Sequence, residues 1–214
     1  EKLCDYLRVI EQDYKETNPY HNPIHAADVV QTMHTLIQMI GDSFPTNKVD
    51  IFSILLAAAV HDVKHPGENN SFQANARTDL ALLYNDCSIL ENRHIAHAFQ
   101  VMLGDEDQNG WRSPPRRLSH VNHGRVSSLN LLCNVQPEQL KSIRAKMIDA
   151  VLHTDMSKHF ASVSSMKALV MNYGDKAAEM DEESSWKVLC FMLHLADISN
   201  PAKPDPLYKV WADR

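Results

Sequence analysis

Glycine, β-type alternation and long apolar runs are all scarce in this chain of 214 residues. With only six glycines and almost no alternation of apolar and polar residues, little of the sequence favours β-strands. No run of about 18 apolar residues exists, so nothing in the chain predicts a membrane span. Basic residues are also in the minority, because 21 Lys and Arg face 27 Asp and Glu, for a net charge of −6. That balance argues against nucleic acid and anionic membrane as main partners.

Cysteine is equally sparse, and its pattern excludes two kinds of site. The four cysteines are widely spaced and never form a C-x-x-C pair: Cys4, Cys87, Cys133 and Cys190. This excludes a disulfide framework and a cysteine-type zinc site, and we expect buried, reduced thiols instead. Histidine is abundant by contrast, with 12 residues. Any bound metal would therefore use histidine and carboxylate ligands.

Helical periodicity dominates the sequence. Over 137–159, apolar residues recur at spacings of three and four, and Pro137 suits a first helical turn. The stretch 50–60 is apolar nearly all round, which predicts a central, buried helix. Further helices are expected at about 2–16, 24–40, 88–103, 162–173 and 184–196. We predict an all-α fold of one domain, or two at most for this length.

One segment departs from the helical pattern. Residues 110–128 contain four arginines, two adjacent prolines, two glycines and no apolar period. We expect an exposed, basic, disordered insertion that joins two helices and carries no chemistry. A phosphate-binding or partner-binding cluster and a translated unspliced segment are the alternatives.

Histidine and aspartate gather in three separate places, each next to a helix end. In the first, Asn22 is a good N-cap and Pro23 suits the following position, so a helix starts there. His25 then lies in the first turn, and His21 lies just before the cap, where it is free to point into a cleft.

The other two places follow apolar helices. His61, Asp62 and His65 come at the end of the stretch 50–60, and His194 and Asp197 end another apolar run. Buried polar groups of this kind need partners, and a metal ion would supply one for all three places. Imidazole and carboxylate suit Zn²⁺, and a shared carboxylate suits Mg²⁺ or Mn²⁺ as a second ion. The pattern indicates a metal-dependent hydrolase.

Six blocks in order make the chain resemble a class I cyclic nucleotide phosphodiesterase. They are YHNPIHAADV (20–29), HDVKHPGENNSF (61–72), LYND (83–86), LENRH (90–94), TDMSKH (154–159) and ADISNPAKP (196–204). The resemblance implies the compact helical catalytic domain of the HD type, here a partial one over 1–214. The chain opens inside a helix, with no signal peptide. It stops at residue 214, before the helices that carry the purine-binding glutamine and aromatic clamp in the family. We therefore expect a fragment.

The resemblance also implies a role for each matching residue. His25, His61, Asp62 and Asp197 would bind a tight zinc ion. Asp62 would bridge to a second ion, Mg²⁺ or Mn²⁺, held through waters near His65, Glu91 and Thr154. His21 would be the general acid, and Tyr20, Met156 and Asn200 would lie near the nucleotide. A hydroxide between the two metals would attack the cyclic phosphate, and the domain would work in the cytoplasm.

His21 needs a proton near neutral pH, although a helix N-terminus and two metal ions disfavour imidazolium. We therefore expect a carboxylate neighbour, and Glu91 is the hypothesis.

Two departures from the family pattern also stand out: Lys64 replaces an acidic residue inside H-D-x-x-H, and Arg93 stands where histidine is common. We expect Lys64 to point to solvent.

The remaining histidines and tryptophans have simpler interpretations. We expect His34 and His97 at the surface or in packing, without carboxylate partners, and Trp186 and Trp211 in the core. His153, His159 and His194 flank the motifs, where supporting and structural roles are both open. His120 and His123 belong to the insertion.

The predicted function is hydrolysis of the 3′ phosphoester of cyclic AMP, cyclic GMP or both, giving the nucleoside 5′-monophosphate. Two alternatives stay open: an inactive module that binds cyclic nucleotide, and an HD-type phosphohydrolase of another substrate.

Overall fold

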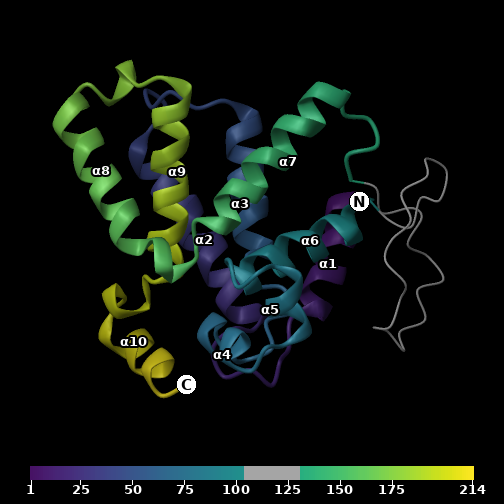
Figure 1. The fold of residues 1–214 in the computed structure, drawn as a ribbon. Helices are drawn as coiled ribbons and strands as arrows, with labels where there is room; N and C mark the ends of the chain where they lie inside the picture. The colour runs from purple at the N-terminus through teal and green to yellow at the C-terminus, as the bar shows by residue number, and fades with distance from the viewer. Residues whose placement is uncertain (104–130) are drawn as a thin grey trace.

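The computed structural model describes residues 1–103 and 131–214, and every regular element within them is helical (Figure 1). The α-helices there are α1 (Lys2–Asp13), α2 (Pro23–Ile40), α3 (Lys48–Val60), α4 (Asn70–Asn75), α5 (Asp79–Leu83), α6 (Ile89–Leu103), α7 (Pro137–Leu152), α8 (His159–Tyr173), α9 (Glu182–Asp197) and α10 (Asp205–Ala212). Short 3₁₀ turns are η2 (Met156–Lys158), η3 (Ala177–Glu179) and η4 (Asn200–Ala202). The predicted all-α bundle is confirmed for these residues. The expected insertion at 110–128 lies outside the described residues.

Helix α3 lies at the centre of the bundle, as its apolar sequence predicted. Its side chains Ile54, Ala57, Ala58 and Val60 have no exposed surface. It packs against α2, α6, α7 and α9, and Figure 1 shows it surrounded by these helices. A capping box starts α3: the Asn47 side chain accepts from the backbone N–H groups of Val49 and Asp50, and the Asp50 carboxylate accepts from the backbone N–H of Asn47. The cap defines where α3 begins, and the last residue of the helix, Val60, is fully buried.

Most predicted helices lie within a few residues of the observed ones, but one boundary and three elements differ. The periodic segment 137–159 is not one helix, because α7 ends at Leu152 and Asp155 caps the turn η2 before α8 begins. Helices α4, α5 and α10 were not predicted. The first two have only six and five residues, too few to show a helical period.

The cysteine prediction is half right. All four cysteines are free, but only Cys190 is buried, and Cys4, Cys87 and Cys133 are exposed. Cys4 lies on α1, which buries Tyr6 and Ile10 instead. Within the described ranges, no helix is long and apolar enough to cross a membrane.

Candidate metal centre

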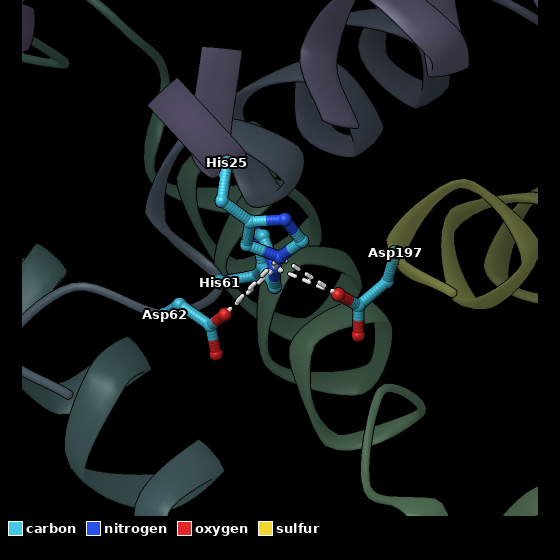
Figure 2. A group of neighbouring side chains, drawn as sticks. All are labelled: His25, His61, Asp62 and Asp197. Atoms are coloured by element: carbon cyan, nitrogen blue, oxygen red, sulfur yellow. Dashed lines mark hydrogen bonds and ion pairs between the residues drawn. The ribbon is translucent and has the colours of Figure 1, made fainter. Parts of the chain in front are cut away.

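Three helix ends meet at one point and bring two histidines and two aspartates together (Figure 2). His25 lies in the first turn of α2, His61 follows the last residue of α3 with Asp62 next to it, and Asp197 is the last residue of α9. Both histidines are fully buried. These are the four residues that sequence analysis assigned to the tight metal.

The start of α2 is defined by its own sequence. The Asn22 side chain accepts from the backbone N–H groups of Ile24 and His25, and Pro23 occupies the first helical position. This cap places the His25 ring against α3 and α9, because it fixes the first turn from which that ring projects. The predicted N-cap is confirmed.

The four donor atoms form a compact cluster. His25 Nε2 lies 3.0 Å from Asp197 Oδ1, 3.4 Å from Asp62 Oδ2 and 3.3 Å from His61 Nε2. His61 Nε2 lies 3.2 Å from Asp62 Oδ2 and 3.3 Å from Asp197 Oδ1. A tetrahedral ion with bonds of about 2.0–2.2 Å requires donor separations of about 3.3–3.6 Å. The observed separations are within a few tenths of an ångström of that requirement.

The protonation pattern also fits a cation. His61 Nδ1 lies 2.9 Å from the Ala58 carbonyl and donates to it, which leaves the lone pair of Nε2 facing the cluster. Asp62 Oδ2 is buried and makes no hydrogen bond of normal geometry among the described residues. Two carboxylates and two imidazole nitrogens facing one another need a positive charge between them. The group is therefore compatible with a bound divalent ion.

Without an ion, protons on the histidines would supply that charge. Burial disfavours the imidazolium form of His25, but Asp197 and Asp62 outweigh it and raise the pKa. Burial acts on His61 in the same way, and the same two carboxylates raise its pKa well above the usual value. Burial opposes ionisation of Asp197, yet His61 and His25 lower its pKa to about 2.

A second group of possible ligands shares Asp62. It comprises Asp62, His65 and His94, and His94 Nε2 lies 3.8 Å from Asp62 Oδ1. His94 Nδ1 lies 2.6 Å from the Val63 carbonyl. Burial lowers the pKa of His65 to about 4 and that of His94 to about 3, so both rings are neutral near pH 7. Sequence analysis missed His94; its place one turn after Glu91 on α6 was the available signal.

Glu91 and Thr154, which were also expected near a second ion, are held by protein contacts. Asn70 Nδ2 donates to both carboxylate oxygens of Glu91, at 3.1 and 2.9 Å. Burial raises the pKa of Glu91. The Thr154 hydroxyl donates to the Val151 carbonyl at 2.8 Å, which leaves its lone pairs able to accept.

His21 stacks on His65, with ring centroids 3.7 Å apart and planes 10° apart. Burial lowers the pKa of His21, and the neighbouring carboxylate that opposes this most is Asp62. Glu91 was the expected partner, but within the described part of the chain its carboxylate hydrogen-bonds to Asn70 and not to His21. The carboxylate that acts on His21 therefore comes from the metal group.

Two of the three expected nucleotide contacts meet beside the cluster. Asn200 Nδ2 donates to the Tyr20 hydroxyl at 2.5 Å, and Tyr20 donates to the Asp197 carbonyl at 3.5 Å. Met156 lies on η2 and is 58% exposed. The Trp211 ring, expected in the core, instead lies 5.4 Å from the Tyr20 ring and 5.9 Å from the His25 ring.

Within the described ranges, the remaining histidines and the other tryptophan discussed in the sequence analysis lie outside the four-residue cluster. Trp186 is buried, as predicted, and His34 is exposed. His97 does have a carboxylate partner, Asp13, at 2.7 Å, because α1 and α6 pack together. His159 Nδ1 lies 2.8 Å from His194 Nε2.

A third set of possible ligands lies between α7 and α9, away from this centre. It consists of Asp149, His153 and Cys190. Its donor atoms are already engaged: Asp149 Oδ2 accepts from Trp186 Nε1 at 2.8 Å, and His153 Nδ1 lies 2.8 Å from the Asp149 carbonyl. This set is a hydrogen-bonded network.

An all-α bundle whose helix ends bring His, His-Asp and Asp together has the architecture of an HD-type domain, and its His/Asp group is compatible with a divalent metal ion. The model of the 3′5′-cyclic nucleotide phosphodiesterase family matches residues 20–214, and the chain belongs to that family.

Named relatives and solved structures agree. The chain is 35% identical to rat 3′,5′-cyclic-AMP phosphodiesterase 4C, over 99% of this chain and 36% of that protein. It is also 35% identical to the dual specificity calcium/calmodulin-dependent 3′,5′-cyclic nucleotide phosphodiesterase 1B of Cricetulus griseus, over 98% and 34%. The crystal structure of the phosphodiesterase domain of Salpingoeca rosetta rhodopsin phosphodiesterase superposes with a TM-score of 0.80 at 31% identity, over 99% of this chain and 57% of that one. The chain thus spans about a third of the length of these curated relatives.

Proposed function

We propose that residues 1–214 form the metal-holding part of a catalytic domain that hydrolyses 3′,5′-cyclic nucleotides. The reaction cleaves the 3′ phosphoester bond of cyclic AMP, cyclic GMP or both and releases the nucleoside 5′-monophosphate in cyclic nucleotide signalling. The observation that carries the proposal is the convergence of His25, His61, Asp62 and Asp197 beside His21. The names of the relatives supply the substrate class. Four free cysteines suit a reducing compartment, in keeping with a cytoplasmic domain.

Zinc is the proposed ion for the four-residue group, since two imidazoles and two carboxylates at tetrahedral separations suit it. Mg²⁺ or Mn²⁺ is proposed for the second group, with Asp62 shared and His65, Glu91 and Thr154 as neighbours. When bound, the two ions supply an activated water and stabilise the charge of an in-line displacement.

His21 is the proposed general acid for the leaving 3′ oxygen. The His21 ring stacks on the His65 ring, and this contact holds His21 beside the four-residue cluster. Burial lowers its pKa, so the free protein keeps it neutral. A phosphodiester carries negative charge, and negative charge beside an imidazole raises its pKa. Substrate binding would therefore supply the protonated form that the reaction needs.

Tyr20, Asn200 and Met156 are proposed to contact the nucleotide. The Tyr20 and Asn200 side chains are tied to each other and to the backbone at Asp197. A nucleotide held by them would therefore keep a fixed position relative to the metal ligands.

The test is release of 5′-nucleotide from cyclic AMP and cyclic GMP by the full-length protein with Zn²⁺ and Mg²⁺. The matched control is His21→Ala, whose zinc content is measured alongside. We expect product from the wild type and a loss of about 10²–10⁴-fold in the control with zinc retained. A folded, zinc-loaded wild type that binds cyclic nucleotide but forms no product would refute catalysis and favour a binding module.

A further inference from the structure

The loop that carries the metal ligands is held from outside by a short segment near the start of the chain. We name residues 13–18 the N-terminal strap and residues 61–66 the ligand loop. The strap precedes the region that matches the family model, which starts at residue 20. Four strap residues contact the ligand loop: Asp13 O accepts from Lys64 N–H at 3.2 Å, Tyr14 Oη accepts from Asp62 N–H at 3.3 Å, Lys15 Nζ donates to Pro66 O at 3.2 Å and Asn18 Nδ2 donates to His65 O at 2.9 Å.

Lys64 is the least relaxed residue of the ligand loop. Its φ is +64°, in the left-handed region that L-residues with long side chains seldom adopt. Asp13 holds both parts of this residue, because its carbonyl accepts from the Lys64 backbone and its carboxylate pairs with the Lys64 ammonium. Asp62 and His65, on either side of Lys64, face the metal groups.

Asp13 also connects the ligand loop to the rest of the bundle. It is the last residue of α1, and its second carboxylate oxygen lies 2.7 Å from His97 Nε2 on α6. Burial opposes ionisation of Asp13, but His97 and Lys64 outweigh it and lower the pKa. The carboxylate is therefore ionised near neutral pH, where the Lys64 ammonium needs an opposite charge.

A lysine two residues from a metal ligand is unfavourable if its charge faces the ion, because like charges repel strongly inside a protein. The Lys64 ammonium pairs with Asp13 at the end of α1, and the Lys64 side chain is 37% exposed, whereas His61 and His65 are buried. We propose that Asp13 is a positioning residue of the metal centre, which holds Lys64 so that the ligand loop presents His61, Asp62 and His65 and turns the ammonium away from the ion. This inference rests on the metal centre proposed above.

Charge exchange between the two partners tests the proposal. The full-length protein is loaded with zinc, and the rate of zinc release to a chelator is measured for wild type, Asp13→Asn, Asp13→Lys, Lys64→Asp and the exchanged pair Asp13→Lys/Lys64→Asp. We expect release about 3-fold faster for Asp13→Asn and at least 10-fold faster for Asp13→Lys. In the exchanged pair, the rate should return to within about 3-fold of the wild type, since aspartate tolerates positive φ better than lysine.

Lys146→Gln is the matched control for loss of an ion pair in the fold. Lys146 Nζ lies 2.7 Å from Asp50 Oδ1, between α7 and α3 and away from the ligand loop. Thermal unfolding of each variant is followed in parallel, and the control should lose stability without faster zinc release. An exchanged pair that releases zinc as fast as the worse single variant, or an Asp13→Lys protein with the wild-type rate, would overturn this inference alone. A wild type that binds no zinc would overturn the metal centre as well.

Discussion

Zinc binding should release protons in a number that the geometry sets. His25 and His61 have raised pKa values because Asp62 and Asp197 lie within 3.0–3.4 Å of their Nε2 atoms. Each ring is therefore protonated in the metal-free protein at about pH 6, and each must lose that proton to bind an ion. The perturbation is addition of zinc to the metal-free protein.

The expected count is about two protons per ion. Asp197 contributes none, because its pKa is about 2 and it is already ionised. His65 contributes none, because its pKa is about 4 and its ring is already neutral. Two protons correspond to a change of about 100-fold in apparent zinc affinity per pH unit, or about 2.7 kcal/mol. The apparent zinc affinity should therefore rise with pH up to the raised pKa values of His25 and His61, and level off above them.

Titration calorimetry in buffers of different ionisation enthalpy measures the proton count directly. The matched variant His25→Gln removes one titrating ligand, so its count should fall to about one. His34→Gln alters an exposed histidine and should leave the count unchanged. Release of less than one proton by the wild type at about pH 6, or a slope independent of His25, would refute the reasoning.

Three further changes test the assignment of ligands and the local folding around them. Asp197→Ala should abolish stoichiometric zinc in elemental analysis, whereas Asp205→Ala, which breaks an exposed pair with Lys209, should retain it; equal zinc in both would reject Asp197 as a ligand. Asn18→Ala removes two hydrogen bonds from a side chain that is 5% exposed and should cost about 1–3 kcal/mol, a fall of several degrees in Tm by calorimetry; a change below about one degree would contradict this. Asn47→Ala removes the capping box of α3 and should cost about 1 kcal/mol in urea unfolding, and an unchanged midpoint would count against the cap.

The sequence allowed prediction of most helices and of the places where histidine and aspartate gather, because both follow from residues that are neighbours in the chain. Asn22 and Pro23 define the start of α2, and the apolar run before His61 defines a buried helix end. A helix end with polar residues inside an apolar environment needs a partner, and that need is visible without coordinates. Local pattern placed histidine and aspartate near three helix ends, and the resemblance to the phosphodiesterase family implied the particular set His25, His61, Asp62 and Asp197.

The other features of the site depend on contacts between segments that are distant in the sequence. The Lys64 side chain was expected in solvent, and its pairing with Asp13 depends on how α1 packs beside the ligand loop, 51 residues away in sequence. His94 and the partner of Glu91 depend on the rotation of α6, and Trp211 faces Tyr20 only because α10 folds back on the cluster.

What the sequence by itself determined is the chemistry of the ligands and the helices that carry them, since these follow from residue type and from periodicity along the chain. What only the tertiary structure decided is which charges lie opposite one another, because that depends on packing angles between helices. No local pattern encodes those angles.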